Sequence, residues 1–337
     1  MTYRGKAARL LLFLLCMLLA CTCALSEEST ERKIVVRQVV LETPAPSDQP
    51  EDLTAEPTAE TSVQIEAPAR RAEIHINETA PEGWSDRVLL RITALKTAPC
   101  DAILMESGDM VMLIDGGTTR FAQRVLDAIN DRGYDNRVNY IFNTHPHDDH
   151  IDAQTQMVKL GLRADEFLTL YPPKYNNDLH KKMVRQVEEK GIGYHQLHDM
   201  ETMEFGHAHL TFYTWQEDTD PNGRSAQCHV LVGTTSVMLT ADLTGKAQHH
   251  YLENYPPEAI HADILKGPHH SLVRMVGDYL TTVDPEFVFI TSSEKHTVNS
   301  REQLTNRKIP FLLVDHGTIT METDGTDWYI FQVRGQM

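Results

Sequence analysis

The chain has 337 residues, of which 41% are hydrophobic, so it can hold one large domain or two small ones. Its 48 acidic residues outnumber its 31 Lys and Arg residues and give a formal net charge of −17. Non-specific binding to nucleic acid normally needs a basic surface. The composition therefore argues against that function, although it leaves room for a local basic groove.

Residues 1–25 are predicted to be a targeting segment. Basic residues precede an unbroken apolar run over residues 10–20. This run is too short to span a bilayer core of ~30 Å, which needs roughly 20 residues, but it has the length of a signal-peptide core. Two cleavage sites remain open: a lipobox that would leave a lipidated Cys21, and a small-x-small site at residues 22–24. Both sites, and an uncleaved anchor as a third alternative, predict a protein outside the cytoplasm.

Residues 26–83 are acidic and rich in Pro and Thr, which predicts a disordered, extended linker. Only residues 33–40 within it have a β-prone composition. The globular domain is expected to cover residues 84–337. Of the five cysteines only Cys100 and Cys228 belong to this domain, too few for a disulfide framework. We expect free thiols there, with a single bridge as the alternative.

The domain is predicted to open with three strands, over residues 88–95, 102–107 and 110–114, which are rich in β-branched and other apolar side chains. An Asp and two glycines follow at residues 115–117, where glycine allows a tight turn and close approach of the backbone to a site. Apolar residues at helical spacing then predict a helix over residues 121–131.

Residues 144–150 offer three imidazoles and two carboxylates in one short stretch. Imidazole nitrogen and carboxylate oxygen are the ligands that zinc, manganese and iron accept. A predicted strand over residues 138–143 precedes the stretch, and a predicted helix over residues 151–160 follows it. The cluster is therefore expected on a loop at the end of a strand, where function usually collects in α/β proteins.

The pattern His-x-His-x-Asp-His after a hydrophobic strand resembles the metal motif of the metallo-β-lactamase-fold hydrolases. The resemblance implies that His145 and His147 hold one metal ion, and that Asp149 and His150 help to hold a second. In that superfamily the residue at the position of Asp115 braces the metal loop by hydrogen bonds, so it is expected behind the ligands.

The opening of the domain resembles the ComEC-like, competence-protein branch of the superfamily. In that branch a strand, a Gly-x-Gly-Asp turn and another strand precede an Asp-Gly-Gly, and Asp101 occupies the acidic position of the turn. Residues 98–100 carry Ala, Pro and Cys where the glycines would be, so this turn is expected to have a different shape.

Later motifs resemble the same branch. Asp242 occupies the position of the carboxylate that bridges two metals. ComEC-like proteins often replace the third histidine of the first metal by an Asn and a Ser, and Asn222 and Ser225 match these positions. His229 could substitute for the missing histidine, but we expect it to pack on its strand.

Residues 262–271 form a buried strand that ends in two histidines and resembles a Leu-Lys-x-x-His-His-Gly-Ser signature. This resemblance implies that His269 is a ligand of the second metal. His270 is the alternative ligand, or a group behind the ligands, or a group that transfers protons. A Gly-His-Pro that commonly follows in the family is absent here, and His296 is a candidate replacement.

Other candidates are weaker. Tyr171 and Tyr175 fall where superfamily members build a substrate wall, but core packing is the better interpretation of Tyr171. His207 and His209 lie at strand spacing, and we expect them not to bind metal. The remaining elements are predicted as strands at 166–171, 205–215, 226–233, 236–240, 286–290, 311–314, 317–321 and 328–333, and as helices at 178–190 and 273–283.

The resemblance implies an α/β fold, a four-layer αββα sandwich with the metal loops along one edge. Two divalent ions, zinc with manganese or iron as alternatives, would share a bridging water. Asp242 would bridge the ions, and Asp149 would bind metal and orient the attacking water.

The expected function is extracytoplasmic hydrolysis of a small-molecule or polymeric phosphodiester. The alternatives are hydrolysis of carbonyl esters or lactones, and a surface binding module that has lost turnover, which the departures at residues 98–100 and 296–300 favour. Hydrolysis of β-lactams is disfavoured, because the third histidine is not evident. Contact with a membrane is expected only through the N-terminal signal or a lipid anchor, and the sequence leaves the oligomeric state open.

Overall fold

The computed structural model describes residues 71–335 of the chain. The predicted signal segment, the lipobox at Cys21 and most of the predicted linker lie outside these residues. No helix between residues 71 and 335 is long and apolar enough to cross a membrane. Both cysteines of this part, Cys100 and Cys228, are buried free thiols.

One sheet has nine strands within residues 71–335. Within it, β4 (Met110–Ile114) runs parallel to β5 (Tyr140–Asn143), and β5 runs parallel to β6 (Glu166–Thr169). In spatial order the strands are β1 (Ile74–Ile76), β16 (Trp328–Gln332), β15 (Ile319–Thr323), β2 (Leu90–Ala94), β3 (Ile103–Ser107), β4 (Met110–Ile114), β5 (Tyr140–Asn143), β6 (Glu166–Thr169) and β7 (Gly193–Gln196).

The edge strand β1 lies before Trp84, where the domain was expected to begin. It pairs in parallel with β16, and the backbone of Trp328 donates to the carbonyl of Glu73. Ile74 and Ile76 also pack against the core between the sheets. These contacts explain why the compact unit starts at Ala72 and includes the last part of the predicted linker.

The other sheet has seven strands within the described part of the chain. Strand β11 (Thr235–Leu239) runs parallel to β12 (Ile264–Lys266), and β12 runs parallel to β13 (Phe287–Ile290), so their carboxyl ends lie at one edge of the sheet. In spatial order the strands are β14 (Phe311–Leu313), β13 (Phe287–Ile290), β12 (Ile264–Lys266), β11 (Thr235–Leu239), β10 (Gln227–Val232), β9 (Ala208–Tyr213) and β8 (Glu201–Phe205).

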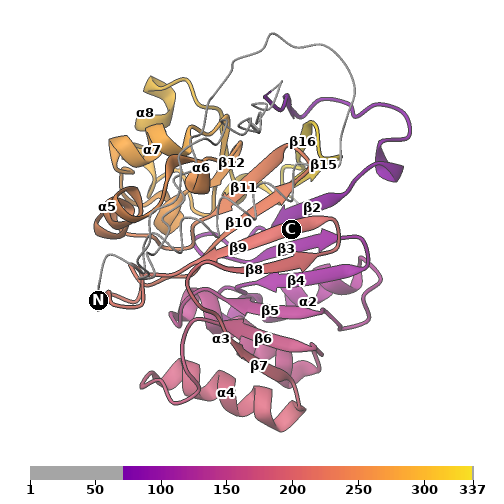
Figure 1. Cartoon of the computed structure of the whole chain (residues 1–337). Helices are drawn as coiled ribbons and strands as arrows, with labels where there is room; N and C mark the ends of the chain where they lie inside the picture. Colours follow the sequence, from indigo (N-terminus) through magenta and orange to yellow (C-terminus); the bar gives the residue numbers. More distant parts are fainter. Residues whose placement is uncertain (1–70, 336–337) are drawn as a thin grey trace, which may run out of the picture. The chain divides into compact units, whose positions relative to one another are not determined.

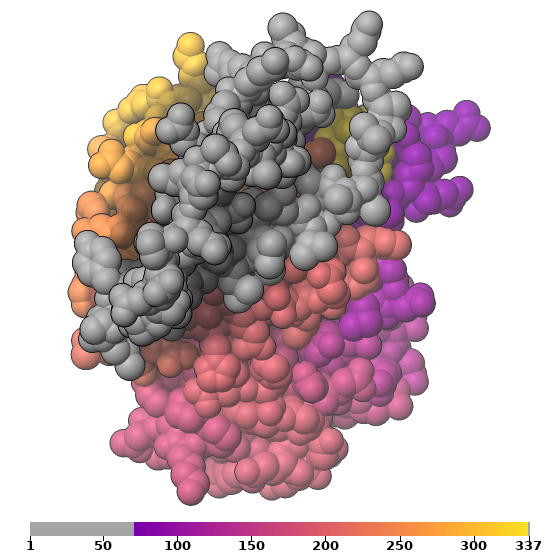
Figure 2. All heavy atoms as spheres, viewed as in Figure 1, coloured from indigo at the N-terminus to yellow at the C-terminus, as the bar shows by residue number. Residues whose placement is uncertain are grey.

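Helices cover the outer faces of the two sheets (Figure 1). The nine-stranded sheet carries α2 (Ala122–Asn130), α3 (Asp148–Leu160) and α4 (Asp178–Lys190). The seven-stranded sheet carries α5 (Gly245–Asn254), α6 (Pro257–Ile260), α7 (Gly277–Val283) and α8 (Val298–Asn306). Short 3-10 turns lie at η1 (Trp84–Asp86), η2 (Thr119–Phe121), η3 (Pro268–Ser271) and η4 (Val314–His316). In space-filling form, side chains of α4 and the neighbouring strands close the spaces between the ribbons (Figure 2).

The alternation of side chains along β3 explains the layering. Ile103 and Met105 pack into the core between the two sheets, whereas Leu104 packs into the core beneath the helices. A strand buried on both faces in this way must lie inside a stack of layers. The predicted four-layer αββα sandwich is therefore confirmed.

Two predicted elements differ in the structure. The helix expected over residues 273–283 begins only at Gly277, because the backbone N–H groups of Met275 and Val276 donate to side chains of other helices, Gln303 and Gln248. The strand pair expected over residues 205–215 begins earlier, as the hairpin of β8 and β9 with its turn at residues 206–207.

Candidate metal centre

The centre forms where strand ends of the two sheets meet. Strands β4 and β5 of one sheet and β11 and β12 of the other each end next to a residue of the cluster described below. Their loops supply Asp115, the metal loop at residues 144–150, Asp242 and the two histidines of η3. The predicted ligands, distant in sequence, are thereby brought together, as expected at the carboxyl ends of parallel strands.

Asp115 holds the metal loop from behind. Its Oδ2 accepts a hydrogen bond of 2.7 Å from Thr144 Oγ1 and lies 2.7 Å from His150 Nδ1. Its Oδ1 accepts from the backbone N–H of Thr144 at 3.0 Å and from Asn143 Nδ2 at 3.1 Å. These bonds fix the ring of His150 so that Nε2 points away from Asp115. Carboxylates orient metal-binding histidines in the same manner.

His145 and His147 face each other on the loop. His145 Nε2 lies 3.1 Å from His147 Nδ1, and His145 Nδ1 lies 3.1 Å from Thr144 Oγ1. His145 is completely buried and His147 is partly exposed. Two imidazole nitrogens at this separation either share one proton or bind the same ion, so the pair can hold a metal.

Asp242 lies at the centre of the histidines. Its Oδ2 is 3.4 Å from Nε2 of both His150 and His270. The same oxygen is 3.8 Å from Nε2 of His145 and of His269. Four imidazoles from two strand ends thus converge on one carboxylate oxygen, which is the arrangement required of a bridging ligand.

Of the two histidines of η3, His270 is placed more deeply in the cluster than His269. His270 Nε2 lies 3.2 Å from Asp149 Oδ2, and its Nδ1 lies 3.1 Å from Asp101 Oδ1 and from Thr291 Oγ1. His269 reaches only Asp242, and its side chain is 29% exposed. The sequence named His269 as the ligand and His270 as its alternative, and the structure places His270 nearer to the other members of the cluster.

The backbone of η3 explains how both histidines point inward. His269, His270 and Ser271 have φ angles of 49°, 51° and 58°. Left-handed backbone is unfavourable for residues other than glycine, and three such residues in succession mark a strained segment. Strain of this kind collects at functional sites, which agrees with the convergence of both rings on Asp242.

Asp101, His150, Asp242 and His270 form the tightest group. One ligand atom from each lies within 4.8 Å of the others, and all four residues are buried. The sequence placed Asp101 behind the ligands; the structure places its Oδ1 3.1 Å from His270 Nδ1 and also makes it a member of this group. Lys266, 1% exposed beside this group, had no assigned role. In the sequence it is the Lys of the Leu-Lys-x-x-His-His-Gly-Ser signature and the charged residue at the end of an otherwise apolar strand.

The charges of the cluster compensate one another. Burial opposes the protonation of His150 and His270, but Asp242, with Asp115 and Asp101, raises both pKa values well above the usual range. Burial likewise opposes ionisation of Asp242, and the two imidazoles outweigh it and hold its pKa well below the usual range. Since metal binding requires neutral imidazoles, an incoming ion would displace these protons.

Two other histidines of the cluster, His145 and His269, have lowered pKa values. Burial lowers the pKa of His145 well below its ordinary value, with a further contribution from His150. Burial also lowers the pKa of His269. A neutral imidazole offers a lone pair to a metal ion without losing a proton first.

Buried polar atoms in the cluster lack the hydrogen bonds that a closed polar core would supply. Nε2 of His150 and Nε2 of His270 have no hydrogen-bond partner among residues 71–335, although both face Asp242. Imidazole nitrogen beside carboxylate oxygen is a donor set that zinc, manganese and iron accept. The residues present therefore fit a divalent ion.

Asn222 and Ser225 lie on the loop that enters β10. The backbone N–H of Ala226 donates to the carbonyl of Thr144, which joins this loop to the metal loop. Ser225 Oγ and Asn222 Oδ1 are buried and have no hydrogen-bond partner in the described part of the chain. Both side chains therefore remain available to a group bound beside the metal loop.

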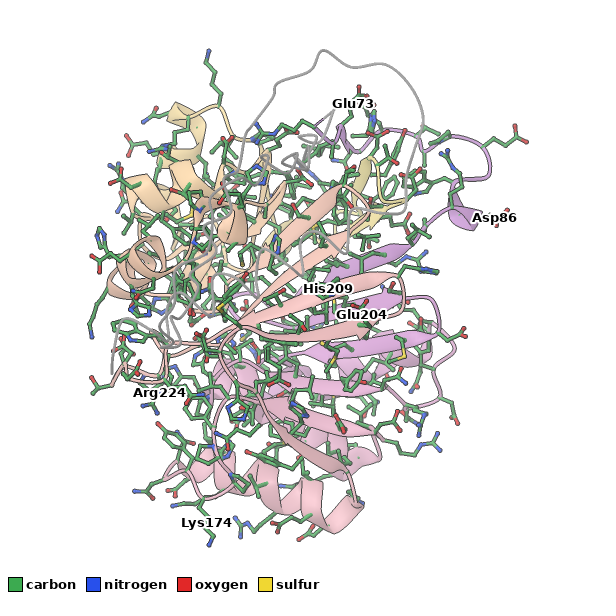
Figure 3. All side chains as sticks on the ribbon, viewed as in Figure 1. Glu73, Asp86, Lys174, Glu204, His209 and Arg224 are labelled. Atoms are coloured by element: carbon green, nitrogen blue, oxygen red, sulfur yellow. The ribbon has the colours of Figure 1, made fainter. Side chains whose placement is uncertain are left out.

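His229 does not replace the missing histidine. It lies on β10, and its Nε2 is 3.0 Å from the carbonyl of His261. Removal from water lowers its pKa to about 4. His209 likewise lies apart from the centre, 2.6 Å from Glu204 on the neighbouring strand, where Figure 3 shows both side chains. His296 is exposed on the loop before α8.

A wall of two tyrosines and an arginine adjoins the metal loop. Tyr171 is buried and Tyr175 is half-buried, and the Arg224 guanidinium lies 5.8 and 5.9 Å from their ring centroids. Arg224 Nε donates to the carbonyl of Asp218, and its two terminal nitrogens have no acceptor among the described residues. Figure 3 shows Arg224 on the loops at the ends of the central strands. The sequence interpretation overlooked Arg224.

An open cavity of about 520 Å³ borders the cluster at Asp149. Its lining includes Asp149 of the cluster and Cys100, whose thiol pKa is raised by burial. Asp149 is therefore the residue of the cluster that this cavity reaches. The lining residues are Pro99, Cys100, Thr118, Thr119, Arg120, Asp148, Asp149 and Asp152.

Comparison with known proteins supports the same fold. Residues 95–151 match the metallo-beta-lactamase superfamily domain, a segment that contains Asp101, Asp115 and the whole metal loop. The two-sheet topology together with this match identifies the metallo-β-lactamase fold. No curated protein sequence matched the chain.

Three solved structures illustrate the similarity. The metallo-beta-lactamase fold protein YhfI from Bacillus subtilis is 14% identical, with 69% of this chain and 99% of that chain covered and a TM-score of 0.48. CmlA, a diiron beta-hydroxylase from Streptomyces venezuelae, is 12% identical, with 73% and 55% covered and a TM-score of 0.46. The metallo-beta-lactamase SMB-1 is 18% identical, with 54% and 82% covered and a TM-score of 0.36.

Proposed function

We propose that this protein is an extracytoplasmic metal-dependent hydrolase that uses a metal-activated water to cleave a phosphodiester. The observation that carries the proposal is the position of Asp242, whose Oδ2 faces the Nε2 atoms of four histidines at 3.4 to 3.8 Å. Such convergence has no use in a purely structural core, where each buried polar atom would have its own hydrogen-bond partner.

The cluster offers ligands for two ions. His145 and His147 would hold the first, and Asp149, His150 and His270 the second, with Asp242 shared between them. When bound, divalent ions lower the pKa of a bound water, from ~15.7 towards ~7 in the case of zinc, and offset charge on the oxygen that develops during hydrolysis. Zinc is the proposed metal, and manganese or iron the alternatives.

Three residues of the chain would orient the water and the metal ligands during hydrolysis. Asp149 would bind metal and accept a hydrogen bond from the attacking water, and its position in the first turn of α3 and in the lining of the cavity supports this role. His270 lies 3.2 Å from Asp149, which places it to receive a proton or to hold the ion. Asp115 keeps His150 oriented throughout.

The phosphodiester assignment draws on the wall beside the metal loop. Arg224 is held over two tyrosine rings with its terminal nitrogens free among the described residues. A guanidinium fixed in this way suits a phosphate oxygen, which it can bind with two parallel hydrogen bonds. The Asn222 and Ser225 positions support the ComEC-like branch, which is also part of this proposal.

The location outside the cytoplasm is proposed from the N-terminal sequence. A basic start followed by a short apolar run and a Pro- and Thr-rich stretch suits a secreted or lipid-anchored protein. Fractionation of cells that produce the full chain, with and without Cys21→Ser, tests both the location outside the cytoplasm and the lipid anchor. Retention in the membrane that depends on Cys21 supports the lipid anchor, and a cytoplasmic pool of uncleaved protein contradicts the proposal.

Metal analysis combined with a chromogenic bis-phosphodiester assay tests the function. Purified protein should contain up to two divalent ions per chain, and H147A and D149A should lose both metal and hydrolysis. Carbonyl ester and lactone substrates run in parallel distinguish the alternative reaction. Protein that binds metal but turns over none of these substrates would instead indicate a surface binding module, and survival of metal and hydrolysis in both variants would remove the site assignment.

A further inference from the structure

Lys266 is a charged residue inside the metal centre. It lies at the end of β12, directly after Ile264 and Leu265, and only 1% of it is exposed. Its Nζ is 2.6 Å from Asp101 Oδ2 and 3.6 Å from Asp242 Oδ1. It also donates to the carbonyl of Ala241 at 2.7 Å. A buried ammonium is retained only when such partners compensate its lost hydration.

Asp101 and Asp242 each direct one carboxylate oxygen to Lys266 and the other to an imidazole. Asp101 turns Oδ2 to Lys266 and Oδ1 to His270 Nδ1, at 3.1 Å. Asp242 turns Oδ1 to Lys266 and Oδ2 to the Nε2 atoms of His150 and His270, at 3.4 Å. Asp101 is therefore held through Oδ2, whereas Asp242 Oδ1 lies at ion-pair distance from Lys266 without a hydrogen-bond partner among the described residues. The other oxygen of each carboxylate faces an imidazole.

We propose that Lys266 is a positioning residue of the metal centre, which aims the free oxygen of Asp242 at the ion and, through Asp101, the Nε2 atom of His270. This inference rests on the proposed function, since it requires that the cluster bind a divalent ion. Lys266 touches neither water nor substrate in this role. It acts by preventing two short side chains from rotating away from the ligand geometry.

Electrostatics alone predicts the opposite effect of removing Lys266. A positive charge beside the site repels a divalent cation, so its loss would raise metal affinity if charge were the only contribution. If Lys266 instead positions two carboxylates, its loss lowers affinity. A lysine that merely fills the core would change stability and leave affinity unchanged. The sign of the affinity change therefore separates the three roles.

The experiment uses the full chain in metal-free form and two probes. Zn²⁺ affinity is measured in competition with a chromogenic chelator, and the melting temperature is measured without metal. In K266M we expect roughly tenfold weaker Zn²⁺ binding or more, the size typical of lost support behind a ligand. We also expect a lower melting temperature, because Asp101 and Asp242 lose their counter-ion. K295M, at an exposed lysine on the loop before α8, is the control and should change neither quantity.

The double variant D101N/K266M keeps the test valid if K266M does not fold. It removes one of the two unpaired carboxylates and should recover much of the melting temperature, while Zn²⁺ binding remains weak because Asp242 still lacks its anchor. Zn²⁺ affinity equal to or above that of the wild type, in K266M or in the double variant, would overturn the role of Lys266 alone. Absence of Zn²⁺ and Mn²⁺ binding by the wild type would overturn the proposed function, and this inference with it.

Discussion

His150 and Asp115 are joined across the base of the metal loop, with Nδ1 of the histidine 2.7 Å from Oδ2 of the aspartate. Asp115 follows β4 directly, and His150 lies in the first turn of α3, so this contact ties a strand end to a helix start. The opposite nitrogen of the ring, Nε2, faces Asp242 at 3.4 Å. Through this contact the end of β4 determines the orientation of the His150 ring.

Replacing Asp115 by Asn tests this relationship. Asn keeps the size of the side chain but has one acceptor oxygen where Asp115 has two, so the contacts with Thr144 and His150 cannot all be retained. We expect divalent-metal affinity to fall by about 10- to 100-fold. A chelator-competition titration measures the change, with D165N, at an exposed aspartate, as the control. Unchanged affinity in D115N would mean that His150 is oriented by other contacts.

Arg224 provides a test of the substrate class. Its loss should remove a charge-assisted hydrogen bond, worth about 1.5–3 kcal/mol, and lower kcat/KM for a phosphodiester by roughly 10- to 100-fold. R224A should act mainly through KM and leave metal content unchanged. K174A, at an exposed lysine on the neighbouring turn, is the control. An equal loss on uncharged ester substrates would show that Arg224 does not recognise an anion.

His229 gives a pH-dependent contribution to stability. Its pKa is about 4 in the folded chain, below the value of about 6.5 expected when unfolded. The unfolded chain therefore binds more protons between these values, so this contribution is complete above about pH 6.5 and is lost as the pH falls towards 4. Urea unfolding at pH 7 and pH 5 should show a smaller loss for H229Q than for the wild type. Equal losses would contradict the assignment.

Gly206 tests the packing of the β8–β9 hairpin on the other sheet. It has a φ of +60°, and a Cβ at this position would lie 2.0 Å from the carbonyl oxygen of Ser107. G206A should therefore lower the free energy of unfolding by about 3 kcal/mol. Gly191 has a similar φ of +68° but open space around it, so G191A should cost only about 1 kcal/mol. Chemical denaturation of both variants compares them, and equal costs would mean that the hairpin can move away from Ser107.

The fold could be predicted because its signals are local and regular. The apolar strand before Thr144 and the acidic, histidine-rich loop after it lie close together in sequence, and so do Asp115 and its glycines. The strand β1 escaped prediction, since its partner β16 is separated from it by most of the chain. A short apolar segment in a polar stretch carries no information about such a distant partner.

The site could be predicted in composition but not in orientation. Adjacent histidines such as His269 and His270 carry equal signals, and only the left-handed backbone of η3 decides which ring enters the cluster more deeply. Lys266 lay within the Leu-Lys signature but received no role, and Arg224 lay in no motif, because the role of either side chain depends on its neighbours in space. The sequence also could not reveal that Asp242 faces four imidazoles at once.

Diffraction from crystals soaked in Zn²⁺, recorded at the zinc absorption edge, tests the central claim most directly. We predict anomalous density within bonding distance of Asp242 Oδ2, with His150 and His270 as ligands on one side and His145 on the other. Density elsewhere on the protein, or none at the cluster in fully soaked crystals, would contradict a metal-dependent hydrolase built on Asp242.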